Sequence, residues 1–554
     1  PYCTQLAPKT DVCREDLVAS DWPPDSPTRE AAAAAGDLMI LAILIPVIGA
    51  FAVLALGRWE NARDAASLVT AICLFYVVTQ FYPIVAAGGR PDVVLLDMVP
   101  GLPIRLTLEP LGMIFAGIAS FLWILTTLYA IGYMRGHHEE NQTRFFFFFA
   151  IAIASAIGVA MAGNMLTLFV FYEVLSVSTF PLVAHHGSEE AKRSGRVYLG
   201  ILLSTSIGFL LFGMIWTWEI AGTLDFVPGG ILEPEMLQGS MTAILLALYA
   251  FGIGKAALMP FHRWLPAAMV APTPVSALLH AVAVVKAGVF SVVKVIVYIF
   301  GLDLLNMMPG TDFLLYVAGF TIIAASVVAL RQDNLKRRLA YSTVSQLSYV
   351  VLAAAILTPI SVVGAAVHIA AHAFGKITLF FAAGAIMVTS NKTEVSQLAG
   401  IGRRMPLTMT AFAIGALSMI GLPPTFGFVS KWFILQGAAQ AEQWLAVSVV
   451  IASTLLNMGY FIPVIYSAFM RPEDRPEDEA KPEAAKADGA NHAPEDHGHD
   501  DHGHDDHHAI KYDHGEAAWP MACALAVTSG MTIILFLNPD LAVGLAKQLM
   551  GIVQ

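Results

Sequence analysis

Residues 368–386 read HIAAHAFGKITLFFAAGAI, an apolar segment that carries two histidines and a lysine. His368, His372 and Lys376 recur every four positions, so an α-helix places them on one face about two turns long. The rest of the segment is apolar or small, as in a helix that crosses a bilayer. The polar stripe is therefore predicted to face other helices and to act as a proton relay, because imidazole titrates near neutral pH. Hydrogen bonding between helices is the alternative role of the histidines.

Four other apolar segments also contain an ionisable residue. They are LTLFVFYEVLSVSTFPLV with Glu173, ILLALYAFGIGKAALMPF with Lys255, LLHAVAVVKAGVFSVV with Lys286 and IGLPPTFGFVSKWFIL with Lys431. One such charge near the bilayer centre costs about 2.5–3.5 kcal/mol even on the lenient insertion scale. A chain that keeps a row of these charges is predicted to move protons or ions through its interior.

The composition is that of a multi-pass membrane protein, since 57% of the 554 residues are hydrophobic and only 13% are charged. Runs of about 20 apolar residues predict an all-α fold of about fourteen transmembrane helices. The predicted helices begin near residues 37, 64, 111, 145, 164, 196, 240, 273, 313, 338, 362, 408, 444 and 518.

Lysine and arginine are concentrated in alternate loops, for example at Arg58, Arg135, Arg193, Arg337 and Arg403. Basic loops mark the cytoplasmic side of a cell membrane or inner membrane. Both chain termini are then predicted outside, and the loop that precedes the last helix is predicted in the cytoplasm.

Helix-breaking residues recur with the buried charges and indicate two inverted five-helix repeats. Lys255 lies in a segment broken by Gly252 and Pro260, and Lys431 lies in one broken by Pro423 and Pro424. Proline frees a backbone carbonyl one turn earlier, and paired discontinuous helices often mark a transport site. We expect hydrated half-channels at both breaks, with simple packing kinks as the alternative.

These patterns divide the chain into six parts. The predicted parts are a polar N-terminal arm (1–36), three transmembrane helices (37–144), the first repeat (145–300), the second repeat (313–470), a disordered acidic histidine-rich loop (471–517), and a last helix with the C-terminus (518–554). In the arm, Cys3 and Cys13 are candidates for a disulfide, because the arm is predicted outside.

The loop 471–516 holds fifteen acidic, five basic and eight histidine residues, so most of the chain's net charge of −11 lies there. Three roles are open for it: a solubilising linker, a pH sensor, or a weak site for zinc, nickel or copper. Nothing in the membrane body indicates nucleic-acid binding. The chain has no CxxC cluster, haem motif or nucleotide loop, so we expect no cofactor and no redox chemistry of its own. The weak metal candidates are His497, His499, His502, His504, His507 and His508.

Four motifs carry a resemblance to a known superfamily. They are WLPAAMVAPTPVSALLHA at 264–281, RRLAYSTVSQLSYVVLA at 337–353, HIAAHAFGKITLFFAAG at 368–384 and GLPPTFGFVSKWFIL at 421–435. They closely resemble the antiporter-like proton-conducting subunits shared by respiratory complex I and Mrp-type cation/proton antiporters. The resemblance covers roughly residues 37–470; the N-terminal arm and the acidic loop depart from the family pattern.

The resemblance assigns roles to individual residues. It implies a Glu173–Lys255 pair at the first broken helix, His280 and Lys286 on the following helix, and Lys431 as the terminal group. Between them it implies a central relay of Lys336, His368, His372 and Lys376. It also implies other membrane subunits as partners, and protons with sodium as the candidate second ion.

Within the superfamily, the resemblance favours the D-type component of an Mrp-type sodium/proton antiporter. Lys431 differs from the glutamate of the complex I M-type subunit, and Lys286 differs from the L-type pattern. No long amphipathic C-terminal arm is seen, which also speaks against the L-type and the large A-type component of the Mrp system. The alternatives are a proton-pumping subunit of a complex I-like oxidoreductase, which would make the chain part of a translocase enzyme, and a membrane partner in inorganic-carbon uptake. A structural subunit with vestigial charges is a further alternative.

Overall fold

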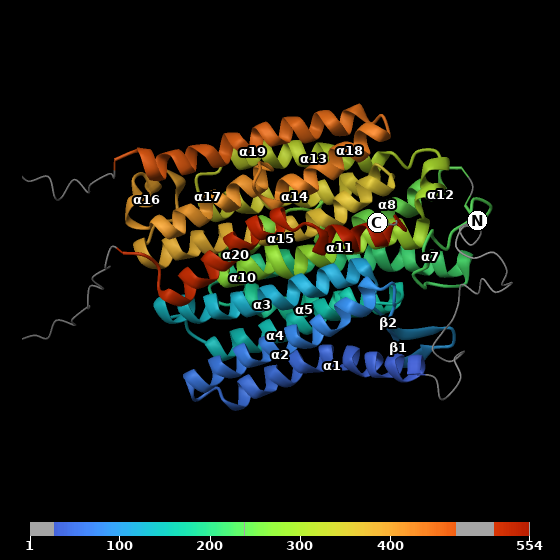
Figure 1. Ribbon diagram of the computed structural model, residues 1–554, viewed down its shortest axis with the longest axis horizontal. Helices are drawn as coiled ribbons and strands as arrows, with labels where there is room; N and C mark the ends of the chain where they lie inside the picture. The colour runs from blue at the N-terminus through green and yellow to red at the C-terminus, as the bar shows by residue number, and fades with distance from the viewer. Residues whose placement is uncertain (1–26, 238, 473–514, 553–554) are drawn as a thin grey trace, which may run out of the picture.

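The computed structural model describes residues 27–237, 239–472 and 515–552 (Figure 1). The predictions on Cys3 and Cys13 and on the histidine cluster from His497 to His508 lie outside these ranges. The described chain is an elongated bundle of roughly aligned helices, as the sequence predicted. Within the described residues, its one sheet is a two-stranded hairpin at one end of the bundle.

The N-terminal helices lie along one side of the bundle, and the hairpin connects the second to the third (Figure 1). The hairpin is antiparallel and is tied to the turn before residue 165, because Leu106 pairs with Ala162 and the Thr107 amide donates to the Met161 carbonyl at 2.7 Å. These elements are α1 (Pro27–Ala55), α2 (Glu60–Ala86), β1 (Asp92–Val99), β2 (Leu102–Thr107) and α3 (Pro110–Gly136).

The first predicted repeat begins with two helices joined by a very short turn. The Asn164 side chain caps the second of them by accepting from the Thr167 amide at 2.8 Å. Short π-helical and 3-10 turns interrupt the later helices. The elements are α4 (Gln142–Ala160), α5 (Met165–Val183), α6 (Glu189–Thr205), η3 (Ser206–Leu210), α7 (Leu211–Ala221), α8 (Met241–Gly252), η4 (Gly254–Ala256), α9 (Trp264–Ala267), η5 (Ala268–Val270), α10 (Thr273–Ala277), η6 (Leu278–Val282), α11 (Val284–Val295) and η7 (Ile296–Phe300).

The second predicted repeat and the last helices complete the bundle. The elements are α12 (Leu302–Met307), α13 (Phe313–Leu330), α14 (Leu335–Ala355), α15 (Pro359–Ser390), η8 (Val395–Leu398), α16 (Ile401–Arg404), α17 (Pro406–Ile420), α18 (Phe426–Gln440), α19 (Trp444–Met470), α20 (Trp519–Leu537) and α21 (Asp540–Leu549).

The burial of the helices separates a centre from a periphery. In the described part of the chain, eleven helices are long and apolar enough to cross a membrane. The apolar windows of Thr273–Phe300 and Pro359–Ser390 are entirely buried, whereas those of α1 and α2 are one third buried. The helix that carries the polar stripe therefore lies at the centre, where its charges avoid lipid. The multi-pass helical fold is confirmed; the number of fourteen spans and the inverted repeat stay predictions.

Candidate functional site

The first broken helix presents Lys255 at the break. Helix α8 ends at Gly252, and Lys255 lies in the short turn η4, fully buried. Its Nζ donates to the Tyr172 carbonyl at 2.8 Å and to Ser176 Oγ at 2.6 Å, and it lies 3.1 Å from the centre of the Tyr172 ring. Helix α11 packs directly on this turn, since a Cβ at Gly288 would lie 2.3 Å from the carbonyl carbon of Lys255.

Glu173 follows Tyr172 on α5, but it does not form an ion pair with Lys255 in the described residues. Both carboxylate oxygens of Glu173 are buried and have no hydrogen-bond partner there. Lys255 thus binds the turn of α5 that carries Glu173, but the two side chains do not form an ion pair. An unpartnered buried carboxylate is a costly arrangement, so the environment of Glu173 is not one that packing alone would favour.

The next group joins α11 to α15. Lys286 Nζ contacts Nδ1 of His372, and both side chains are fully buried. The other ring nitrogen of His372 has no hydrogen-bond partner among the described residues. His280, in the π-helical turn η6, is also fully buried; its ring packs 4.8 Å from that of Phe380, and neither of its nitrogens is bonded in the described chain.

The polar stripe of α15 contacts two further helices. His368 places Nδ1 at 2.8 Å from Ser430 Oγ and Nε2 at 3.1 Å from Gln346 Oε1. The rings of His368 and His372 lie 6.3 Å apart. Lys376 Nζ instead donates to Ser342 Oγ at 2.7 Å, so it turns toward α14.

The second broken helix is held by Lys431. Helix α17 ends before Gly421, whose φ of +87° favours glycine and where a Cβ would lie 2.6 Å from Cδ of Lys431. Lys431 Nζ donates to the carbonyls of Met419 at 3.0 Å and Ile420 at 2.9 Å. These are the carbonyls that the two prolines after the break leave free, so the lysine satisfies them in place of the backbone.

Lys336 stands apart from this central group. It lies at the start of α14, is partly buried, and donates to the Ala271 carbonyl at 2.6 Å. The predicted relay is therefore drawn together at His368 and His372 but not at Lys336.

Sequence reasoning missed a buried ion pair. Lys294 Nζ lies 3.0 Å from Oε1 of Glu109, with only 1% and 5% of their side chains exposed. The signal present in the sequence was the spacing of Lys294, eight residues after Lys286 on one helix face. Glu109 gave less signal, because it immediately precedes the third apolar segment.

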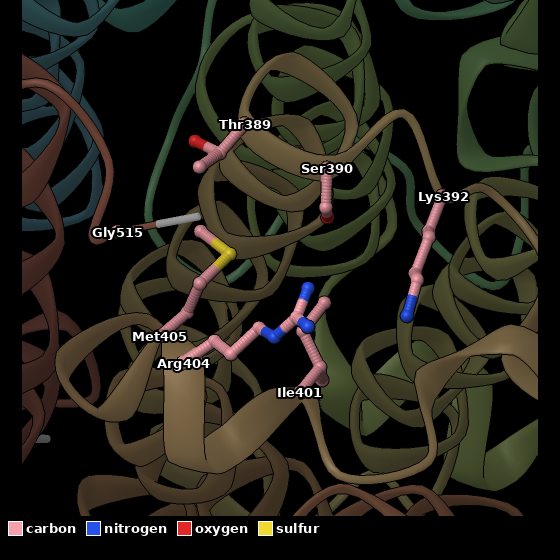
Figure 2. A pocket seen from close by; sticks show the side chains of 7 residues that line it. All are labelled: Thr389, Ser390, Lys392, Ile401, Arg404, Met405 and Gly515. Atoms are coloured by element: carbon pink, nitrogen blue, oxygen red, sulfur yellow. The ribbon is translucent and has the colours of Figure 1, made fainter. Parts of the chain in front are cut away.

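The described residues contain no cluster of three or more His, Cys, Asp or Glu side chains that could hold a metal. A small pocket shown in Figure 2 lies at the far end of α15 and against α16, lined by Thr389, Ile401 and Met405 among others. Thr389 is thirteen residues beyond Lys376, about 20 Å along the helix. The pocket is thus separate from the buried basic groups.

Helices broken at buried lysines, together with a histidine stripe at the bundle centre, define a membrane protein built to move ions. Residues 162–457 match the family described as "NADH:quinone oxidoreductase/Mrp antiporter, TM". The chain belongs to this family. It is therefore a multi-pass membrane protein of a proton-translocating family, and the matched region contains all the predicted site residues from Glu173 to Lys431.

Individual relatives come from both branches of the family. The chain is 33% identical to the N-type subunit of the NADH-quinone oxidoreductase of Desulforudis audaxviator, over 68% of this chain and 75% of that protein. It is 26% identical to the D-type subunit of the Na(+)/H(+) antiporter of Alkalihalophilus pseudofirmus, over 80% of this chain and 89% of that protein.

Solved structures agree on the fold. A chain of the Mrp complex from Dietzia sp. DQ12-45-1b superposes with a TM-score of 0.77 at 21% identity, covering 94% of this chain and 97% of that one. A chain of the archaeal membrane-bound sulfane sulfur reductase gives 0.75 at 23% identity, covering 93% and 98%.

Proposed function

We propose that the chain is the proton-translocating subunit of a multisubunit cation/proton antiporter that exchanges sodium for protons. The observation that carries the proposal is a line of buried basic groups. Lys286 contacts His372, and the His372 ring lies beside the ring of His368. His368 in turn is hydrogen-bonded to Ser430, the residue before Lys431. Neutral packing residues would fill this space at less cost, so the groups are retained for transport.

The first broken helix acts as the switch of the mechanism. Lys255 binds the α5 turn that carries Glu173, so its positive charge stabilises the Glu173 carboxylate. When Lys255 loses its proton, that stabilisation disappears and Glu173 takes up a proton or moves. Lys255 and Glu173 are therefore predicted to change protonation together.

The central groups pass the proton on by repulsion, because no described ion pair neutralises them. Two positive charges at the 6.3 Å separation of the His368 and His372 rings repel by about 2–3 kcal/mol at an effective dielectric constant of about 20. That energy changes a protonation equilibrium by roughly a hundredfold. A proton arriving at Lys286 or His372 thus drives one away from His368 toward Lys431.

Two residues and one relative support a D-type component. The chain has lysines at 286 and 431, and the D-type antiporter protein of Alkalihalophilus pseudofirmus is matched over 89% of its length. In this proposal the partners are the other membrane subunits of the antiporter, and the basic loops face the cytoplasm. The hairpin end of the bundle then faces outside.

A complex I-like assembly is the second candidate, favoured by the 33% identity to an N-type oxidoreductase subunit. A membrane partner in inorganic-carbon uptake is a third. Purification in mild detergent, with mass spectrometry of the co-migrating subunits, separates them: small Mrp-type subunits support the antiporter, whereas quinone-reductase subunits overturn that assignment. Sodium addition to everted vesicles that hold the complex should collapse an imposed pH gradient.

A further inference from the structure

The Glu109–Lys294 ion pair joins the start of α3 to α11. Glu109 is the residue before α3, and Lys294 is at the end of α11. Lys294 Nζ also donates to the Ala162 carbonyl at 2.7 Å and lies 4.4 Å from the centre of the Phe226 ring. The pair therefore lies beside the α4–α5 turn, to which β2 is also bonded. The hairpin is at the end of the bundle opposite α16 (Figure 1).

Toward the centre of the bundle, Lys294 lies on the same face of α11 as Lys286. Lys286, Phe290 and Lys294 follow each other at four-residue spacing on α11, so they share one face. The two lysines are about 12 Å apart along the helix axis. Phe290 fills the intermediate turn: its ring lies 5.4 Å from Lys294 Nζ and 5.2 Å from the ring of Phe115.

On its outer side, the pair approaches charged groups at the surface. Arg105 on β2 lies 3.0 Å from Asp92 and 3.7 Å from Asp225, and these three side chains are 26–41% exposed. Leu106, the next residue on β2, pairs with Ala162, whose carbonyl binds Lys294. One layer of backbone thus separates a solvated charge cluster from a fully buried one.

We propose that Glu109 and Lys294 form a second acid–base pair, which exchanges protons between Lys286 and the aqueous face at the hairpin. The inference rests on the proposed proton translocation. In the exchange, the Lys294 ammonium gives its proton to the Glu109 carboxylate, leaving neutral amine and acid. The acid then releases the proton to water at the face, and the amine takes the next proton from Lys286. Phe290 must move aside for that last transfer, so it separates the two steps.

A purely structural role explains the pair less well. The hairpin is already fixed to the α4–α5 turn by backbone bonds, including Gly163 N to the Arg105 carbonyl at 2.9 Å. A buried ion pair adds little net stability over apolar residues of the same size. Its retention at the end of a line of buried lysines is therefore better explained by proton exchange.

The test uses the assembled complex in everted vesicles from a host that lacks its own copy. Glu109→Gln keeps the size of the side chain and removes its titration, so proton transport per assembled complex should fall at least about tenfold. Glu109→Asp keeps a carboxylate and should retain transport with a shifted pH profile. Asp64→Asn is the matched control: Asp64 forms a buried pair with Arg63 at 2.8 Å near the opposite end, and its loss should lower the amount of complex but not the transport per complex.

The outcomes are distinct. Wild-type transport in the Glu109→Gln complex, or equal loss per complex in the Asp64→Asn control, overturns the proton-exchange role. If Glu109→Gln does not assemble, Glu109→Asp decides: an unchanged pH profile overturns the inference and a shifted profile supports it. If the wild-type complex itself moves no protons, the proposed function fails and not this inference alone.

Discussion

Replacing Lys431 by methionine tests whether the second broken helix needs this side chain for proton transport or only for assembly of the complex. Methionine keeps the apolar stem and removes both the donor and the titratable group. The Ile420 carbonyl then loses the donor that binds it at 2.9 Å, which costs about 1–3 kcal/mol. The Met419 carbonyl keeps two donors at 3.3 Å, from Gln346 and Asn457.

The loss is offset because the buried ammonium is removed, which relieves a desolvation penalty of several kcal/mol. The Lys431→Met complex should therefore assemble in near-normal amounts, while proton transport falls at least about tenfold. The assay is dissipation of a pH gradient in everted vesicles, normalised to assembled complex. Wild-type transport by an assembled Lys431→Met complex would refute the role of Lys431 as a proton carrier.

Three further predictions concern other parts of the chain. Glu173→Gln and Lys255→Met should each abolish transport without preventing assembly, and the double variant should be no worse than either. Additive losses in vesicle transport would show that the two residues act independently. Burial and the nearby Arg144 lower the pKa of His185, outside the spans, to about 4. The neutral ring is thus favoured in the folded state, so stability should decrease as pH falls from about 6.5 to 4, and histidine hydrogen exchange read by mass spectrometry should give this low pKa. Deleting 476–512 should leave transport at neutral pH near normal; loss of activity in an assembled complex would exclude both the linker and the sensor roles.

The helices and the central polar stripe could be predicted because hydropathy and helical spacing are local signals. The stripe from His368 to Lys376 faces the bundle interior as expected, since lipid exposure of these groups is costly. The freeing of two carbonyls by Pro423 and Pro424 was likewise a local effect, and the structure shows Lys431 bound to both of these carbonyls.

Contacts between distant segments could not be predicted in the same way. The family resemblance implied a Glu173–Lys255 pair, and that functional pairing stays a prediction. Only the structure shows that Lys255 binds the Tyr172 carbonyl and Ser176, on the α5 turn that carries Glu173. Glu109 and Lys294 are 185 residues apart. Glu109 lies at the start of an apolar run, where a charge is unremarkable, and Lys294 lies inside one, but no local signal pairs the two residues.

The most direct test of the central claim is proton movement in proteoliposomes that contain the purified complex, with either the wild-type chain or Lys286→Met. Lys286 contacts His372 and is the first group of the buried line, so its replacement should interrupt the path without exposing polar backbone. The account predicts a sodium-dependent change of internal pH with the wild-type complex and a loss of about tenfold or more with Lys286→Met. Equal pH changes in both preparations, with equal amounts of intact complex, would contradict it.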